Sequence, residues 1–101
     1  YDLLAIVASA VGRGARRAAA HFLAPVEQHD DRYDSELVKT LRAYLRADGR
    51  PADAAAALHI HRNTLRYRLI QVEKLMGVDL QTLDGRTAAA LALRLHDVGT
   101  S

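Results

Sequence analysis

Apolar residues recur along this chain at intervals of three and four positions, and no segment of strand length alternates between apolar and polar residues. The clearest run has apolar side chains at Leu37, Val38, Leu41, Tyr44 and Leu45. This spacing places apolar side chains on one face of an α-helix. Alanine, leucine and arginine, which favour helices, are frequent, and aromatic residues make up only 5% of the chain. The sequence therefore predicts an all-α fold, with Tyr44 in the core.

Glycine, proline and polar residues divide the chain into six predicted helical segments. The third segment carries the run just described, and the other five are expected near residues 3–10, 15–23, 52–58, 62–76 and 84–98. The last segment is expected to carry Ala88, Leu91, Ala92, Leu95 and Val98 on one side. Such short amphipathic helices fit a small helical bundle.

Residue types at the ends of these segments match known helix boundaries. Asp34 or Ser35 can cap the third helix, because both side chains accept hydrogen bonds from first-turn amides, and Gly49 is expected to end it. Pro51 suits the first turn of the next helix. Gly77 is expected just after the fifth helix, and Asp84 can cap the sixth.

The polar, acid-rich run at residues 27–34, after Pro25, is interpreted as a connector and as the domain boundary. Residues 1–32 are then expected to be an N-terminal helical segment or linker, and residues 33–99 a separate helical domain. With 101 residues the chain has room for one modest core. It begins with Tyr1 rather than methionine, so we expect it to be the end of a longer protein.

The composition limits the kinds of site and the location that we expect for the chain. The chain has no cysteine, which excludes disulfides and thiolate metal sites and fits a reducing compartment, so a cytoplasmic location is expected. No apolar run approaches the roughly 20 residues that cross a bilayer, so no membrane association is expected. The net charge of +2 is small, but Arg62, Arg66, Arg68 and Lys74 lie close together against a single acid, Glu73. The positive charge is therefore concentrated in residues 62–74.

The basic segment at residues 62–76 has two unlike faces when it is drawn as a helix. Leu65, Leu69, Val72 and Met76 share the face expected to be buried. The opposite face carries Asn63, Arg66, Tyr67, Ile70 and Lys74, with Thr64 and Gln71 at one flank and Arg68 nearer the core edge. This outer face is basic and rich in hydrogen-bonding groups.

The segments before this helix indicate the motif to which the basic face belongs. A short alanine-rich helix, a turn at residues 59–61 with Ile60 as an apolar anchor, and then a longer basic helix are typical of a helix-turn-helix. The second helix of that motif enters the DNA major groove. The turn residue His59 stands where the backbone often needs positive φ.

Several side chains of this helix suit DNA. Arg66 can donate two hydrogen bonds to guanine, and Asn63 can pair with adenine. Arg62 and the hydroxyls of Thr64 and Tyr67 are placed for phosphates near a helix N-terminus, and His61 is expected near a phosphate as well.

The motif also resembles a known family. Residues 56–69, AALHIHRNTLRYRL, look like the signature of the PucR family of bacterial transcriptional regulators, whose C-terminal domain contains a helix-turn-helix. Residues 36–45 (ELVKTLRAYL), 77–80 (GVDL) and 90–95 (ALALRL) resemble the segments on either side of it. The resemblance implies a small helical bundle with a Fis-like helix-turn-helix in residues 33–99.

The resemblance implies a function as well. It is that of a sequence-specific DNA-binding output domain of a bacterial transcriptional regulator, which binds double-stranded DNA as a homodimer. An upstream sensory domain that responds to a metabolite, and no cofactor in this domain, are part of the same expectation. The expected DNA-binding residues are His61, Arg62, Asn63, Thr64, Arg66, Tyr67, Arg68 and Lys74.

Other interpretations compete with DNA binding. The main alternative is a helical protein-interaction or dimerisation module that keeps the architecture without binding DNA. Ile70 on the outer face could contact a thymine methyl group or a protein partner, although a tolerated exposed residue is the favoured interpretation. His59 and His61 are two residues apart and would point to different faces of a helix, so no metal site is expected.

Catalytic and nucleotide-binding patterns are not evident either. His21, His29 and His96 are expected to stand alone, without a catalytic or metal-binding arrangement around them. The break at residues 12–14 lacks the strand and spacing of a phosphate-binding loop. An enzyme is therefore not expected.

Overall fold

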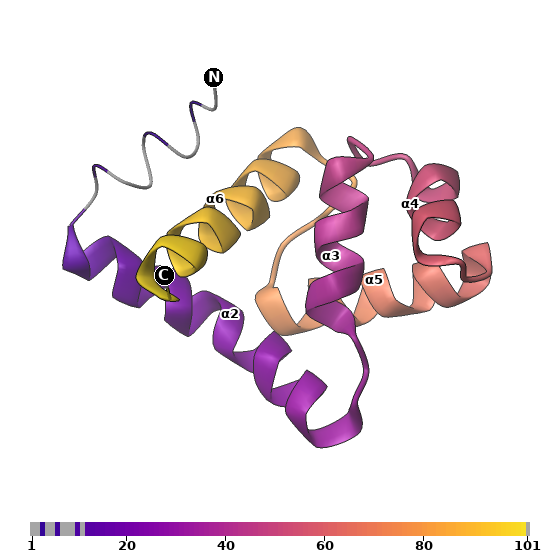
Figure 1. The fold of residues 1–101 in the computed structure, drawn as a ribbon, viewed down its shortest axis with the longest axis horizontal. Coiled ribbons are helices and arrows are strands. Elements are labelled where there is room, and N and C mark those ends of the chain that lie inside the picture. Colours follow the sequence, from indigo (N-terminus) through magenta and orange to yellow (C-terminus); the bar gives the residue numbers. More distant parts are fainter. Residues whose placement is uncertain (1–2, 4–5, 7–9, 11, 101) are drawn as a thin grey trace.

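The computed structural model describes Leu3, Ile6, Ala10 and residues 12–100, with side chains described as far as Asp97. Within these residues it has no strand and consists of helices α2 (Arg13–Tyr33), α3 (Leu37–Arg46), α4 (Pro51–Leu58), α5 (Arg62–Met76) and α6 (Leu83–Thr100) (Figure 1). The predicted all-α fold is confirmed. The predicted helix at residues 3–10 falls mostly outside the described residues.

Helix α2 is longer than predicted. It runs through Pro25 and includes residues 27–33, so the connector expected there is wrong. Proline inside a helix removes one backbone hydrogen bond and costs about 3 kcal/mol, but the neighbouring Leu23 and Val26 are fully buried in the core. Burial of this face outweighs the local cost, because packing supplies most of the stability of a helix in a protein.

The true connection between α2 and α3 has only three residues, 34–36. Asp34 and Glu36 both have positive φ, of 51° and 56°. Because α2 contacts α3, α5 and α6, its buried residues belong to the same core as those of the later helices. The proposed division of the chain into residues 1–32 and 33–99 stays a prediction.

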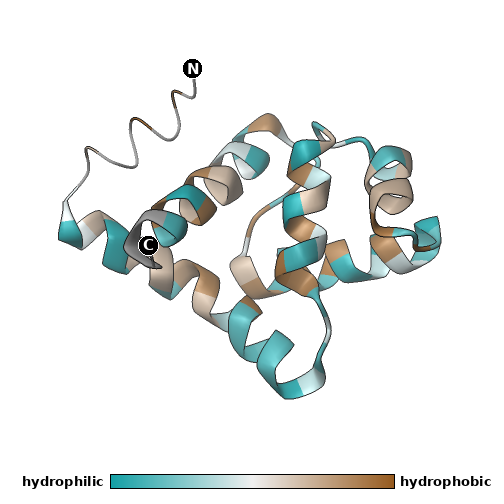
Figure 2. Ribbon diagram, viewed as in Figure 1, coloured by the Kyte–Doolittle hydropathy of each residue, from teal (hydrophilic) through white to brown (hydrophobic). Residues whose placement is uncertain are grey.

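One apolar core joins α2, α3, α5 and α6 (Figure 2). Its largest fully buried apolar side chains are Leu23, Val26, Leu37, Leu41, Leu65, Val72 and Leu80. Tyr44 is buried with them as predicted, and its hydroxyl donates a hydrogen bond to the carbonyl of Leu80, at 3.2 Å. This bond fixes the loop after α5 against α3.

The cap of α3 comes from a residue that sequence reasoning did not select. The Asp30 carboxylate in α2 accepts hydrogen bonds from the backbone N–H groups of Leu37, at 2.6 Å, and Val38, at 3.0 Å. The prediction of a cap at Asp34 or Ser35 is therefore wrong. Ser35 instead donates its hydroxyl to Asp30, at 2.6 Å.

Helix α6 also begins differently from the prediction. It starts at Leu83, and the Thr82 hydroxyl accepts a hydrogen bond from the Gly85 N–H, at 3.0 Å, so Thr82 rather than Asp84 occupies the capping position. The predicted inner face is partly wrong, because Ala88 is exposed and Ala89 is buried in its place. Ala92 and Leu95 are buried as predicted, Leu91 is partly buried, and the side chain of Val98 lies outside the described residues.

Three other predicted boundaries are confirmed. Helix α3 ends at Arg46 and is followed by a turn in which Gly49 has φ 78°. Pro51 is in the first turn of α4. Gly77 follows α5 with φ 72°, and its N–H donates to the carbonyl of Glu73.

Candidate nucleic-acid interface

Helices α4 and α5 form a helix-turn-helix (Figure 1). The buried Ala54 and Ala55 let α4 pack closely on α3 and α5. At the end of α4, His59 has φ 56° and ψ 43°, so its φ is positive as predicted from its place in the turn. The N–H of His59 donates to the Ala56 carbonyl and the N–H of Ile60 to the Ala55 carbonyl. These two bonds form a Schellman motif, with the partly buried Ile60 packed against the core behind it.

The inner face of α5 is the predicted one. Leu65, Leu69, Val72 and Met76 are all buried, and Leu65 and Val72 are inaccessible to solvent. The helix therefore has only one orientation in which its apolar side chains are covered, and this orientation fixes which side chains point outward.

The outer face carries most of the predicted DNA-binding residues. The exposed members of that set are His61, Arg62, Asn63, Thr64, Arg66, Tyr67 and Lys74. Tyr67 and Ile70 are the exposed large hydrophobic residues of α5, at 64% and 40%. Asn63 and Arg66, one turn apart, belong to this same exposed ridge.

Arg68 differs from the other predicted residues. It is only partly exposed, and its guanidinium donates a hydrogen bond to the Thr40 hydroxyl in α3, at 3.4 Å. Thr40 is fully buried and donates its own hydroxyl to the Glu36 carbonyl, at 2.8 Å. The structure therefore places Arg68 at the edge of the outer face, as its angle on the helix predicted.

His61 has a structural role that the sequence analysis missed. Its Nδ1 accepts a hydrogen bond from the Asn63 N–H, at 3.0 Å, so the imidazole caps the N-terminus of α5. An accepting Nδ1 leaves the ring proton on Nε2 in the neutral imidazole, where it faces outward as a donor. In the sequence, the signal for this cap is a histidine directly before a polar, helix-forming run.

The acid of the basic segment is held by the loop after α5. Glu73 is partly buried, and its carboxylate accepts a hydrogen bond from the Leu80 N–H, at 2.8 Å. The Glu73 carboxylate is thus bound to the loop after α5, and the charged side chains on the exposed ridge are cationic.

A groove of about 1240 Å³ runs beside the N-terminal half of α5. Arg62, Asn63 and Arg66 line one side of it. Its other lining includes Arg50, Gln81 and Arg86, which sequence reasoning did not select, and the acids Asp53 and Glu73. Arg50 comes from the start of α4, and Gln81 and Arg86 come from the region around the start of α6, so only the folded chain brings them beside α5.

Two predicted lone histidines have partners in the structure. His96 Nε2 lies 3.2 Å from the Glu27 carboxylate, which joins α6 to α2. His29 Nδ1 lies 2.7 Å from the Ser35 hydroxyl. The described residues include no cluster of three or more histidine, cysteine or acidic side chains that could hold a metal ion. None of the described helices is both long and apolar enough to cross a membrane.

The fold and the exposed ridge together define a helix-turn-helix domain. Residues 37–95 match the family described as the PucR C-terminal helix-turn-helix domain. This segment covers more than half of the chain, so the chain belongs to that family.

Several curated proteins are similar to this chain. The DNA-binding transcriptional activator AdeR of Bacillus subtilis (strain 168) is 32% identical over 84 residues, which are 80% of this chain and 20% of that protein. The carbohydrate diacid regulator of Escherichia coli (strain K12) is 43% identical over 61 residues, or 60% of this chain and 16% of that protein. The proline-responsive transcriptional activator PutR of Bacillus subtilis (strain 168) is 40% identical over 73 residues, or 72% of this chain and 17% of that protein.

This chain thus spans between 16% and 20% of the length of these three regulators. No solved structure matches it.

Proposed function

We propose that this chain is the DNA-binding output domain of a bacterial transcriptional regulator, with α5 as the recognition helix in the major groove. The observation that carries the proposal is the outer face of α5, where Asn63 and Arg66 are exposed one turn apart on a helix whose opposite face is buried. Membership of the PucR C-terminal family and the names of the three regulators support the same role.

Two residues of this face are proposed to read bases. The guanidinium of Arg66 can donate two hydrogen bonds to O6 and N7 of one guanine, and the amide of Asn63 can donate to N7 and accept from N6 of one adenine. Both side chains are exposed near the beginning of α5, where a recognition helix approaches base edges.

The remaining polar residues are proposed to bind the DNA backbone. Arg62 and Thr64 lie in the first turn of α5, where unpaired backbone N–H groups and the helix dipole also attract phosphate. His61 can donate from Nε2 while Nδ1 holds the cap. Tyr67, Arg68 and Lys74 extend the same cationic face along the helix.

The larger protein is part of the proposal too. The three regulators are five to six times longer than the part that matches, so we infer that an upstream region senses a metabolite and that this domain is its output. We also infer a homodimer. A two-fold dimer would place its recognition helices about 34 Å apart, one turn of DNA, and bind a palindromic site.

A protein-interaction module is the second candidate function. The exposed Tyr67 and Ile70 favour it, since large apolar groups on one outer face are also what a protein partner would cover. In this alternative the arginines of α5 would only surround an apolar contact.

The dependence of binding affinity on salt concentration distinguishes the two functions. Duplexes selected by this chain from a random pool would be used to measure affinity between 50 and 400 mM salt. For DNA binding, log K should fall linearly with log salt, at about 0.9 per phosphate neutralised. Failure to enrich any duplex, or a slope near zero, would rule out the proposed function and leave the interaction module.

A further inference from the structure

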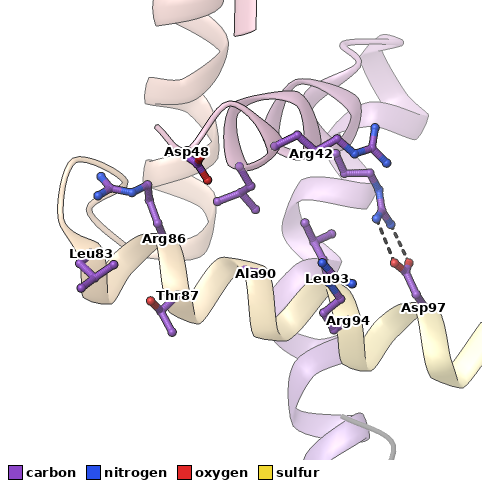
Figure 3. A pocket seen from close by; sticks show the side chains of 11 residues that line it. Arg42, Asp48, Leu83, Arg86, Thr87, Ala90, Leu93, Arg94 and Asp97 are labelled. Atoms are coloured by element: carbon purple, nitrogen blue, oxygen red, sulfur yellow. Dashed lines mark hydrogen bonds and ion pairs between the residues drawn. The ribbon is translucent and has the colours of Figure 1, made fainter. Parts of the chain in front are cut away.

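One arginine of the groove beside α5 comes from outside the helix-turn-helix. Arg86 lies in the first turn of α6, and it lines the same groove as Arg62 and Arg66 of α5. Its guanidinium points toward the loop that follows α5, and away from Asp97 near the other end of α6 (Figure 3). The fold thus brings a cation from a third helix to the side of α5.

Two other backbone segments hold the Arg86 side chain in place. Its Nη1 donates a hydrogen bond of 3.0 Å to the Leu80 carbonyl, which also accepts a hydrogen bond from the buried Tyr44 hydroxyl. A Cβ added to Gly49 would lie 3.0 Å from Cδ and Nε of Arg86 and 3.2 Å from its Cζ, so the side chain lies directly against the glycine backbone. Because both contacts restrict a long side chain, Arg86 has less conformational entropy to lose when it binds a ligand.

The bond to a carbonyl leaves the positive charge of Arg86 available. A carbonyl is neutral, a guanidinium has five N–H donors, and no carboxylate pairs with Arg86 among the described residues. Other arginines nearby are paired. Arg42 donates to Asp97 at 3.0 and 2.7 Å (Figure 3), and Nε of Arg50 lies 2.6 Å from the Asp53 carboxylate. Arg86 is thus a partly exposed cation without an acid partner in the part of the chain that the structure describes.

Positive charge exceeds negative charge along the groove beside α5. The charged lining among the described residues consists of Arg50, Arg62, Arg66 and Arg86 and of the acids Asp53 and Glu73. Asp53 is bound to Arg50, and Glu73 accepts its hydrogen bond from a backbone N–H. The cations without an acid partner therefore come from two elements, α5 and α6.

We propose that this groove takes the backbone of one DNA strand and that Arg86 binds a phosphate of that strand. The inference rests on the proposed function and adds to it a contact from outside the helix-turn-helix. With α5 in the major groove, the phosphates of the two strands lie on either side of the helix. The strand on the side of Arg62 and Arg66 enters the groove and meets Arg86 there.

The chemistry of Arg86 suits a phosphate. A guanidinium binds phosphate oxygens through charge-assisted hydrogen bonds from more than one nitrogen. Nη1 of Arg86 is bound to the Leu80 carbonyl, whereas its Nε and Nη2 have no hydrogen bond among the described residues. The carbonyl orients the guanidinium, and the remaining donors are left for the anion.

A purely structural role of Arg86 is the alternative that the test must separate. Arg86 also anchors the loop after α5, so its loss could weaken DNA binding by loosening that loop. Tyr44→Phe removes the other hydrogen bond to the Leu80 carbonyl without changing any charge, so it is the matched control for loop order. Arg17→Gln removes an exposed arginine of α2 that does not line the groove, so it is the matched control for charge.

Affinity for a duplex selected by the wild type, measured over a range of salt concentrations, tests the phosphate contact. Arg86→Gln should bind about tenfold more weakly at low salt, and the slope of log K against log salt should fall by about 0.9 per bound copy. The loss should be equal on an unrelated duplex, because a phosphate contact carries no sequence information. Arg86→Lys, Tyr44→Phe and Arg17→Gln should all keep the slope of the wild type.

A neutral phosphate analogue locates the contact. Methylphosphonate, which removes the charge of one phosphate, would be placed at each backbone position of the selected duplex in turn. At one position of each half-site it should weaken binding by the wild type but not by Arg86→Gln, because that variant has already lost the contact. At positions contacted by α5, both proteins should lose affinity equally.

An unchanged slope in Arg86→Gln, or a slope lowered equally in Tyr44→Phe, would overturn the inference and leave the base-reading role of α5 intact. Equal effects of every methylphosphonate on the wild type and Arg86→Gln would overturn it as well. Urea unfolding establishes first that each variant is folded.

A measurement on the wild type covers the case in which Arg86→Gln does not fold. The selected duplex should protect Arg86 from modification by phenylglyoxal while Arg17 stays reactive, and an unprotected Arg86 would overturn the inference. Failure of the wild type to select any duplex is a different result, because it would overturn the proposed function and this inference with it.

Discussion

The carboxylate of Asp30, in the last turns of α2, accepts a hydrogen bond of 2.6 Å from the backbone N–H of Leu37, the first residue of α3. The same carboxylate accepts a second bond from Val38. A side chain from one helix thus caps the next across a three-residue connection in which two residues have positive φ. This acid therefore holds the first turn of α3 against the end of α2.

Replacing Asp30 should therefore destabilise the domain. We expect Asp30→Ala to lower the free energy of unfolding by about 1–2 kcal/mol, because two first-turn N–H groups lose their acceptor. Urea unfolding measures the effect. Asp31→Ala is the matched control, since the exposed Asp31 caps nothing, and its stability should stay close to that of the wild type. Equal losses in the two variants would contradict the capping role.

His61 should contribute to stability separately from DNA binding. His61→Ala removes the acceptor for the Asn63 N–H and is expected to cost about 1 kcal/mol in denaturant unfolding. His61→Asn, which restores a favoured capping side chain, should recover most of that loss. If the asparagine variant is as unstable as the alanine variant, the cap is not what His61 contributes.

Two glycines in helices should respond oppositely to alanine. A Cβ on Gly85 would lie 1.8 Å from the Asp79 carbonyl oxygen, so Gly85→Ala must displace the loop before α6 and should cost about 1–3 kcal/mol. Gly14 in α2 has open space around it, and Gly14→Ala should stabilise the helix by about 0.5–1 kcal/mol. Thermal unfolding of both variants checks this. If Gly85→Ala leaves the stability unchanged, the loop before α6 can move to make room for the added Cβ.

The ion pair between Arg42 and Asp97 predicts a small loss of stability in acid. The hydrogen bonds from Arg42 lower the pKa of Asp97 from its ordinary value of 3.8, against the opposing effect of burial. A depressed carboxyl pKa stabilises the fold above pH 3.8, and that stability is lost as the pH falls through the lower, folded-state value. Because the two side chains are 31% and 46% exposed, we expect about 1 kcal/mol or less.

Unfolding of the wild type and Asp97→Asn, compared from pH 6 to pH 2, measures this pair. The difference in stability between the two proteins should be greatest at pH 6 and shrink below pH 3.8, as Asp97 becomes neutral in both the folded and the unfolded wild type. A difference that is constant with pH would show that the charge of Asp97 is not involved.

Arg66 should carry sequence preference rather than general affinity. On a selected duplex we expect Arg66→Ala and Arg66→Lys each to lose about 1–3 kcal/mol of discrimination at one base pair, since lysine keeps the charge but not the two-pronged donor. Asn63→Ala should lose preference at a different base pair. Leu65→Asp, by contrast, should unfold the domain, because it buries an unpaired charge where Leu65 is inaccessible. Unchanged preference in Arg66→Ala would refute its assignment.

The sequence predicted α5 and its two faces well because one physical signal dominates there. Leu65, Leu69 and Val72 repeat at helical spacing, a turn precedes them and Gly77 follows, so local and tertiary preferences agree. The positive φ at His59 followed from the same motif. The exposure of Asn63 and Arg66 needed no further information than this periodicity.

Features that depend on the approach of distant segments were not predictable in the same way. Pro25 and the acids after it favour a connector locally, but burial of Val26 keeps α2 helical. The cap by Asp30 needs a turn of known shape between two helices. Gln81 and Arg86 join the groove beside α5 only after the loop following that helix has folded back.

The contact between Arg68 and Thr40 has one more consequence. Thr40 is fully buried in α3, and its hydroxyl accepts the hydrogen bond from Arg68. Arg68, at the edge of the outer face of α5, is therefore linked to a helix that lies outside the helix-turn-helix. If α5 binds DNA as proposed, a tilt of α3 would shift Arg68 and change its contact with the DNA backbone without moving Asn63 or Arg66.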